Sequence, residues 1–126
     1  MRFRRQGESG QAMVEFIIVL PLFFALLWTV VQFGVLFREQ LALSDAVRVA
    51  ARKAAVSRFA ADPVATTRAV GEDAADLPSK PTIDVTSDWQ AGSVVTVTGT
   101  FHYSFHILGI GVYSGDLVSV TKDRVE

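Results

Sequence analysis

The sequence predicts an α+β chain in which a long N-terminal transmembrane helix continues outside the membrane. A short second helix and a small antiparallel sheet of about three strands are expected to pack on that helix. Two observations predict this order. Residues 16–37 contain no charged side chain and residues 38–61 contain neither proline nor glycine. From residue 82 onward, valine, threonine and aromatic residues alternate with the two-residue period of strands.

The apolar stretch 16–37 has the length of a membrane span. A helix of this length rises by about 1.5 Å per residue and covers roughly 33 Å, against a hydrocarbon core of about 30 Å. Three basic residues precede the stretch and only Glu8 opposes them: Arg2, Arg4 and Arg5. Because basic residues beside a span stay in the cytoplasm, we predict a cytoplasmic N-terminus, although Arg38 directly after the stretch argues in the other direction.

The helical pattern does not stop at the membrane edge. Pro21 should bend the helix, because it removes one backbone hydrogen bond. Beyond the span, one apolar face recurs at helical spacing through Leu43, Val47, Ala50 and Ala54. A row of small side chains at every fourth position should let another helix or a sheet approach closely: Ala42, Ala46, Ala50 and Ala54. We expect one helix from about Ala12 to Ala61, ending before Asp62-Pro63.

After this helix the chain changes its character. Residues 64–76 favour a short second helix, and residues 77–81 form a loop by composition. The three expected strands cover residues 82–85, 94–105 and 117–125. The first two should be joined through residues 90–92, and the last two through a glycine-rich loop at Gly109, Gly111 and Gly115. This sheet should pack on the distal half of the long helix, since each would otherwise leave an apolar face in water.

Several function classes are disfavoured. The chain has no cysteine, which excludes disulfides and thiolate zinc sites, and it has no basic stripe for nucleic acid. His102 and His106 share a strand face with Ser104, but no third catalytic or metal-binding residue is evident nearby, so exposed strand histidines are the favoured interpretation. Gly109-Ile110-Gly111 is too short for a nucleotide loop. We therefore predict no enzyme activity, cofactor, metal, nucleic acid or small-molecule substrate.

The apolar run admits three interpretations. A cleaved secretory signal has an apolar core of about 7–15 residues and a small-x-small site, whereas this run is longer and lacks that site. A plain signal anchor without processing is the second. The third rests on the segment Gly10-Gln11-Ala12-Met13-Val14-Glu15-Phe16, which resembles the processing signal of type IV pilins. Its Glu-Phe pair is similar to the variant found in tight-adherence (Tad, or Flp) pilins.

The resemblance extends further along the chain. Several segments are similar to the TadE-like family of minor pilins. They are residues 10–16, Leu20-Pro21-Leu22, Gln32-Phe33-Gly34, residues 40–48 and, more generally, Arg124-Val125-Glu126. The resemblance implies a pilin-like fold and a pseudopilin of the bacterial inner membrane that takes part in assembling a type IVb-like Flp pilus. It also implies cleavage between Gly10 and Gln11 by a prepilin peptidase. The implied partners are the lipid bilayer, other Tad pilins and the platform membrane proteins, and incorporation into the pilus stays open.

This interpretation divides the chain into a leader (1–10), a transmembrane helix (11–37) and an extracytoplasmic part (38–126). Glu15 and Phe16 are then candidate assembly residues. An ionised side chain in a membrane helix is costly unless it reaches water, a headgroup or a partner. Glu15 either extends to the cytoplasmic headgroups or neutralises the amine that cleavage creates at Gln11. The alternative function is a signal-anchored extracytoplasmic interaction module unrelated to pili.

Overall fold

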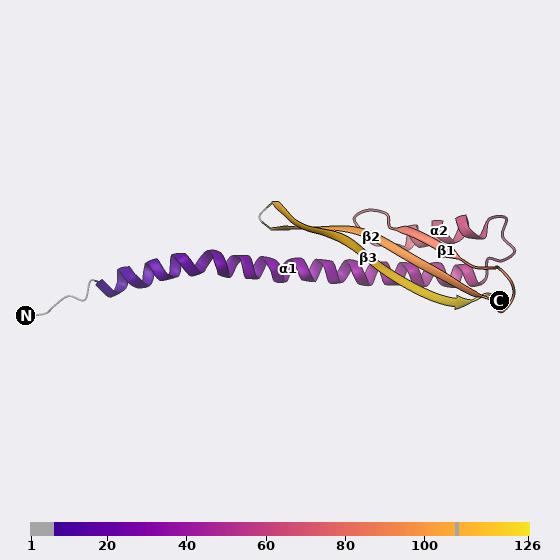
Figure 1. Cartoon of the computed structure of the whole chain (residues 1–126), viewed down its shortest axis with the longest axis horizontal. Helices are drawn as coiled ribbons and strands as arrows, with labels where there is room; N and C mark the ends of the chain where they lie inside the picture. Colours follow the sequence, from indigo (N-terminus) through magenta and orange to yellow (C-terminus); the bar gives the residue numbers. More distant parts are fainter. Residues whose placement is uncertain (1–6, 108) are drawn as a thin grey trace, which may run out of the picture.

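The computed structural model describes residues 7–107 and 109–126. Two helices precede a three-stranded sheet: α1 (Gly7–Ala55), α2 (Pro63–Ala74), β1 (Thr82–Thr86), β2 (Val94–Ile107) and β3 (Ile110–Arg124). Figure 1 shows α1 running along the long axis of the molecule, with α2 and the sheet gathered beside its C-terminal half. The predicted α+β fold is confirmed.

Helix α1 is continuous for 49 residues and contains Pro21. It begins at Gly7, inside the predicted leader, and it ends at Ala55, so the expectation that it would continue to Ala61 is wrong. Polar groups near the C-terminal end of α1 donate hydrogen bonds to its last carbonyls. The Ser57 hydroxyl donates to the Lys53 carbonyl at 2.5 Å, and the Glu126 amide donates to the Ala55 carbonyl at 3.0 Å. The C-terminus of the chain therefore caps α1 before the Asp62-Pro63 stop is reached.

Helix α2 starts where the sequence provides a cap. The Asp62 carboxylate accepts a hydrogen bond from the Ala65 amide at 2.9 Å, and Pro63 occupies the first turn. Gly71 brings α2 against α1, because a Cβ atom built on this glycine would lie 2.9 Å from the Ala50 Cβ. Glycine at this position is thus a requirement of close helix packing.

The sheet is antiparallel in the order β1-β2-β3. β2 and β3 form a long hairpin that continues beyond the end of β1, since β1 pairs no further along β2 than Thr100. The predicted glycine-rich loop is wrong for Gly111 and Gly115, which lie within β3. Only Gly109, with a φ of 82°, serves the turn. Gly115 instead makes room for the cross-strand Tyr103, whose Oη would lie 3.1 Å from a Cβ added there.

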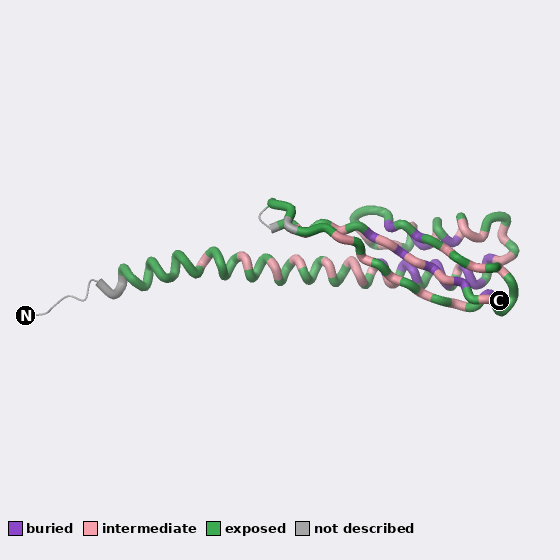
Figure 2. The backbone as a smooth tube through the Cα atoms, viewed as in Figure 1, coloured by how far each residue is buried: buried purple, intermediate pink, exposed green. Residues whose placement is uncertain are grey.

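The core joins the distal half of α1 to one face of the sheet. Its fully buried large side chains include Leu43 and Val47 from α1 and Ile83, Val95 and Val97 from the strands. In β2 the buried residues alternate with half-buried threonines, as a sheet with one face on a core requires. Figure 2 shows the buried residues confined to this end of the molecule. The predicted packing of the sheet on the distal half of the helix is confirmed.

Gly99 lies where β2 packs closely on α1, and it gives a test of this packing. A Cβ atom at Gly99 would lie 2.4 Å from Val47 Cγ2 and 3.0 Å from Leu43 Cδ1. Gly99→Ala should therefore lower the free energy of unfolding by about 1–3 kcal/mol through overpacking. Gly111→Ala is the matched control, because among the described atoms its Cβ would meet His106 alone, at an ordinary contact distance of 3.7 Å. Denaturant unfolding of the detergent-solubilised chain should separate the two variants, and equal stabilities would contradict this packing.

Candidate membrane and assembly interface

The N-terminal half of α1 exposes apolar side chains on all sides. This helix is long and apolar enough to cross a membrane, and none of its most apolar window is buried against the rest of the protein. Large exposed side chains occur at almost every turn: Met13, Phe16, Ile17, Ile18, Leu22, Phe23, Phe24, Leu26, Leu27, Val30, Val31 and Phe33. An apolar surface of this extent marks a membrane or protein contact, and a helix that is apolar all round fits both. The helix is thus compatible with a single-pass membrane anchor.

Gly10 and Gln11 lie on an open part of α1. Gly10 is exposed, and no heavy atom of residues 7–107 or 109–126 lies within 4 Å of a Cβ atom built on it. The fold of this chain therefore does not require glycine at position 10, in contrast to Gly71 and Gly99. A requirement for a small residue at Gly10 would have to come from another molecule.

The structure brings Gln11 and Glu15 together. The Gln11 side-chain amide donates to the Glu15 carboxylate at 3.3 Å, across the one-turn spacing of the helix. Phe16 follows Glu15 and is 63% exposed. Glu15 and Phe16, the predicted assembly residues, thus project from α1 without cover from any other described part of the chain.

The alanine row takes part in packing within the chain. Ala46, Ala50 and Ala54 are fully buried and Ala42 is half-buried. Ala50 faces Gly71 of α2, so part of this row is occupied by the second helix of the same chain. The row is therefore not a free surface for a neighbouring subunit, and the exposed apolar surface lies nearer the N-terminus.

A contact that sequence reasoning missed joins the hairpin to the apolar part of α1. The Trp28 indole N–H donates to the His106 carbonyl at 3.0 Å, and the Gln32 amide donates to the same oxygen at 2.9 Å. The rings of Phe33 and Phe105 lie 6.3 Å apart at the same level. Figure 1 shows β2 ending and β3 beginning alongside α1, on the side toward its N-terminal half. These partners are more than seventy residues apart in sequence, so no local pattern reveals the contact.

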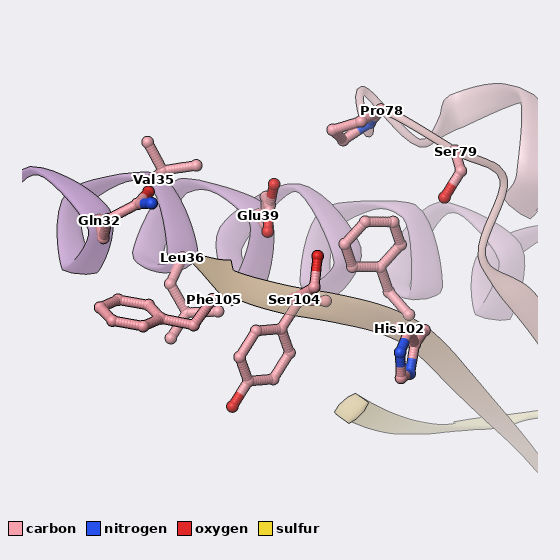
Figure 3. A pocket seen from close by; sticks show the side chains of 11 residues that line it. Gln32, Val35, Leu36, Glu39, Pro78, Ser79, His102, Ser104 and Phe105 are labelled. Carbon is pink, nitrogen blue, oxygen red and sulfur yellow. The ribbon is translucent and has the colours of Figure 1, made fainter. Parts of the chain in front are cut away.

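A shallow groove of about 270 Å³ lies between α1 and β2. Figure 3 shows Gln32, Leu36 and Glu39 on α1, with His102, Ser104 and Phe105 on β2. His102 Nδ1 lies 2.8 Å from the Asp116 carboxylate on β3. Among the described residues, no group of three histidines and acids could hold a metal ion. His102 lines the groove while Asp116 does not, and this exposed histidine–acid pair by itself does not form a catalytic site.

Comparison with known proteins identifies one family. Residues 10–52 match the family model described as TadE-like protein, which confirms the resemblance found in the sequence over this segment. The match begins at Gly10 and ends three residues before the end of α1. No curated protein and no solved structure shows significant similarity to this chain. The family match thus covers α1, while α2 and the sheet lie outside it.

Proposed function

We propose that this chain is a membrane-anchored minor pilin, or pseudopilin, with a structural and non-enzymatic role in assembling a tight-adherence (Flp) pilus. The observation that carries the proposal is the TadE-like match, which links residues 10–52 to Tad pilus systems in general. An exposed apolar helix occupies the first half of this segment and a folded domain is attached to the second half. This is the arrangement that a subunit needs if it is stored in a membrane and displays a domain outside it.

The apolar surface of α1 suits two environments in turn. In the bilayer, lipid chains cover it. In an assembled filament, the same surface can pack against α1 of neighbouring subunits, because a helix that is apolar all round is stable wherever water is excluded. The basic residues Arg2, Arg4 and Arg5 favour a cytoplasmic N-terminus in the inner membrane, with the sheet on the opposite side.

Cleavage between Gly10 and Gln11 by a prepilin peptidase is the second part of the proposal. The exposure of Gly10 supports it, because an enzyme can reach this peptide bond without moving another part of the described chain. The residues before the bond also favour local unwinding. Gly7 and Gly10 each cost a helix about 1 kcal/mol relative to alanine. The first turn of α1 can therefore become extended in a peptidase at little cost.

Glu15 is proposed to neutralise the ammonium group that cleavage creates at Gln11. The 3.3 Å contact between the Gln11 side chain and Glu15 supports this, since it places the two residues within reach on one helix. Within a bundle of α1 helices the same carboxylate can reach the ammonium of a neighbouring subunit. An unpaired charge in such an environment is expensive, so pairing favours the assembled arrangement.

Deleting the gene for this chain from its host tests the proposal against the alternative of an anchored interaction module unrelated to pili. We expect surface pili to be lost, as counted by electron microscopy, and to return when the full chain is supplied from a plasmid. The proposed partners are the other Tad pilins and the platform membrane proteins, and their levels should be checked by immunoblot. Wild-type pilus numbers in the deletion strain would contradict a role in assembly.

A further inference from the structure

The end of β2 lies beside the apolar run of α1, at Trp28 and Gln32. The hairpin tip is defined here by five residues at this end of β2 and β3: Phe105, His106, Ile110, Gly111 and Tyr113. Its position is fixed by the hydrogen bonds from Trp28 and Gln32 to the His106 carbonyl. A membrane that extended along α1 to Phe37 would therefore enclose part of the hairpin.

Lipid cannot enclose that part of the hairpin. Among the described residues, β3 is an edge strand throughout and β2 pairs with no second strand beyond Thr100, so near the tip both edges of the hairpin lack a strand neighbour, and the His106 carbonyl is bonded only by side chains of α1. Open sheet edges do not occur within the hydrocarbon region, because nothing there accepts their hydrogen bonds. The outer edge of the hydrocarbon core must then lie near Trp28–Gln32.

The length of α1 agrees with this boundary. Residues 11–31 of a helix cover roughly 31 Å, which matches a hydrocarbon core of about 30 Å. Trp28 then lies at the outer interface, where tryptophan and tyrosine are enriched because their rings are apolar and their polar groups reach water. Gln32 is the first polar amide after this point.

The composition of the tip suits the same interface. Residues 103–115 contain no Asp, Glu, Lys or Arg, and they include both tyrosines of the chain, Tyr103 and Tyr113. Ile110 is 71% exposed and Tyr113 is 63% exposed, although both belong to an otherwise folded hairpin. The far end of the same hairpin carries Lys122, Asp123 and Arg124. The apolar end of the hairpin therefore points toward the membrane, and the charged end points away from it.

We infer that the hairpin tip is a second membrane contact, in which Ile110 and Tyr113 enter the headgroup region of the outer leaflet beside Trp28. The inference rests on the proposed function, in that α1 must span the bilayer. Together, helix and tip limit the tilt of the folded domain relative to the membrane plane, because a single helix alone would leave the domain free to lean. The hairpin tip thus binds a phospholipid bilayer.

Depth measurements test the inference directly, since the chain has no cysteine of its own. Single cysteines replace Ile110, Tyr113, Leu22 and Ala91, and each carries an environment-sensitive fluorophore. Leu22 reports on the middle of the span, and the exposed Ala91 reports on the far end of the domain. The full chain is placed in nanodiscs at one copy per disc, with nitroxide quenchers at the headgroup or deep in the acyl chains.

We expect blue-shifted emission for Ile110→Cys and Tyr113→Cys, with stronger loss of fluorescence to the headgroup quencher than to the deep one. Leu22→Cys should be quenched most by the deep quencher, and Ala91→Cys by neither. If Leu22 is deep and both tip positions behave like Ala91, the tip inference is wrong while the membrane anchor stands. If the tip is protected only with several copies per disc, its occupant is another subunit and the lipid proposal is overturned. If Leu22 is not deep, both the anchor and the tip inference fail.

Discussion

Replacing Gly10 with valine is expected to abolish processing, leaving the whole population as full-length precursor in the membrane. The peptidase should need a small residue at the membrane edge, where a branched side chain would obstruct its site. Nothing within the described chain opposes the substitution, because no atom lies within 4 Å of a Cβ at Gly10. An immunoblot against a C-terminal tag should show a single band of precursor size.

Gly34→Val is the matched control for this variant. Gly34 lies on the same helix and also has no atom within 4 Å of an added Cβ. It should therefore be processed like the unmodified chain, so that a defect confined to Gly10→Val reports on cleavage alone. If Gly10→Val still begins at Gln11, the assignment of the cleavage site is wrong.

Replacing Glu15 with glutamine is expected to abolish pilus assembly while leaving membrane levels and cleavage normal. Insertion should not suffer, because the apolar run is long enough without the acid and removing a charge favours insertion. Assembly should suffer, because the ammonium at Gln11 would lose its charge partner in a low-dielectric environment. Removing one partner of a buried ion pair costs about 3–5 kcal/mol, or roughly a hundred-fold or more in an equilibrium constant. Pilus counts and co-purification with other pilins measure the loss.

Glu39→Gln provides the comparison, since this acid lies on the same helix beyond the hairpin tip and lines the open groove. It should assemble normally. If the Glu15→Gln variant builds wild-type numbers of pili, Glu15 only extends to the cytoplasmic headgroups and its charge is not needed to pair with the ammonium group at Gln11.

Local patterns were sufficient to predict much of the fold. The absence of proline and glycine between residues 38 and 61 predicted that α1 would continue beyond the apolar run without a break, and the alternation of valine and threonine predicted β2. The end of α1 could not be predicted, because Ala55 is capped by Glu126 from the other end of the chain. Gly115 was misassigned to a loop for a related reason. Its role depends on the cross-strand ring of Tyr103 and not on its own conformation.

The candidate site divides in the same way. Gly10, Gln11, Glu15 and Phe16 form a contiguous motif, so the sequence alone identifies them and the family match begins among them. The hairpin tip could not be found, because its contact with Trp28 joins segments 78 residues apart. Trp28 lies within the apolar run, and its partner, the His106 carbonyl, comes close only in the folded chain.

The N-terminal mass of the chain tests the central claim most directly. The protein should be extracted from host membranes with detergent, digested and analysed for its N-terminal peptide. A processed pilin predicts a peptide that begins at Gln11, with no peptide that retains residues 1–10 in a strain with active peptidase. An N-terminus at Met1 in that strain would contradict the account and favour an unprocessed membrane anchor.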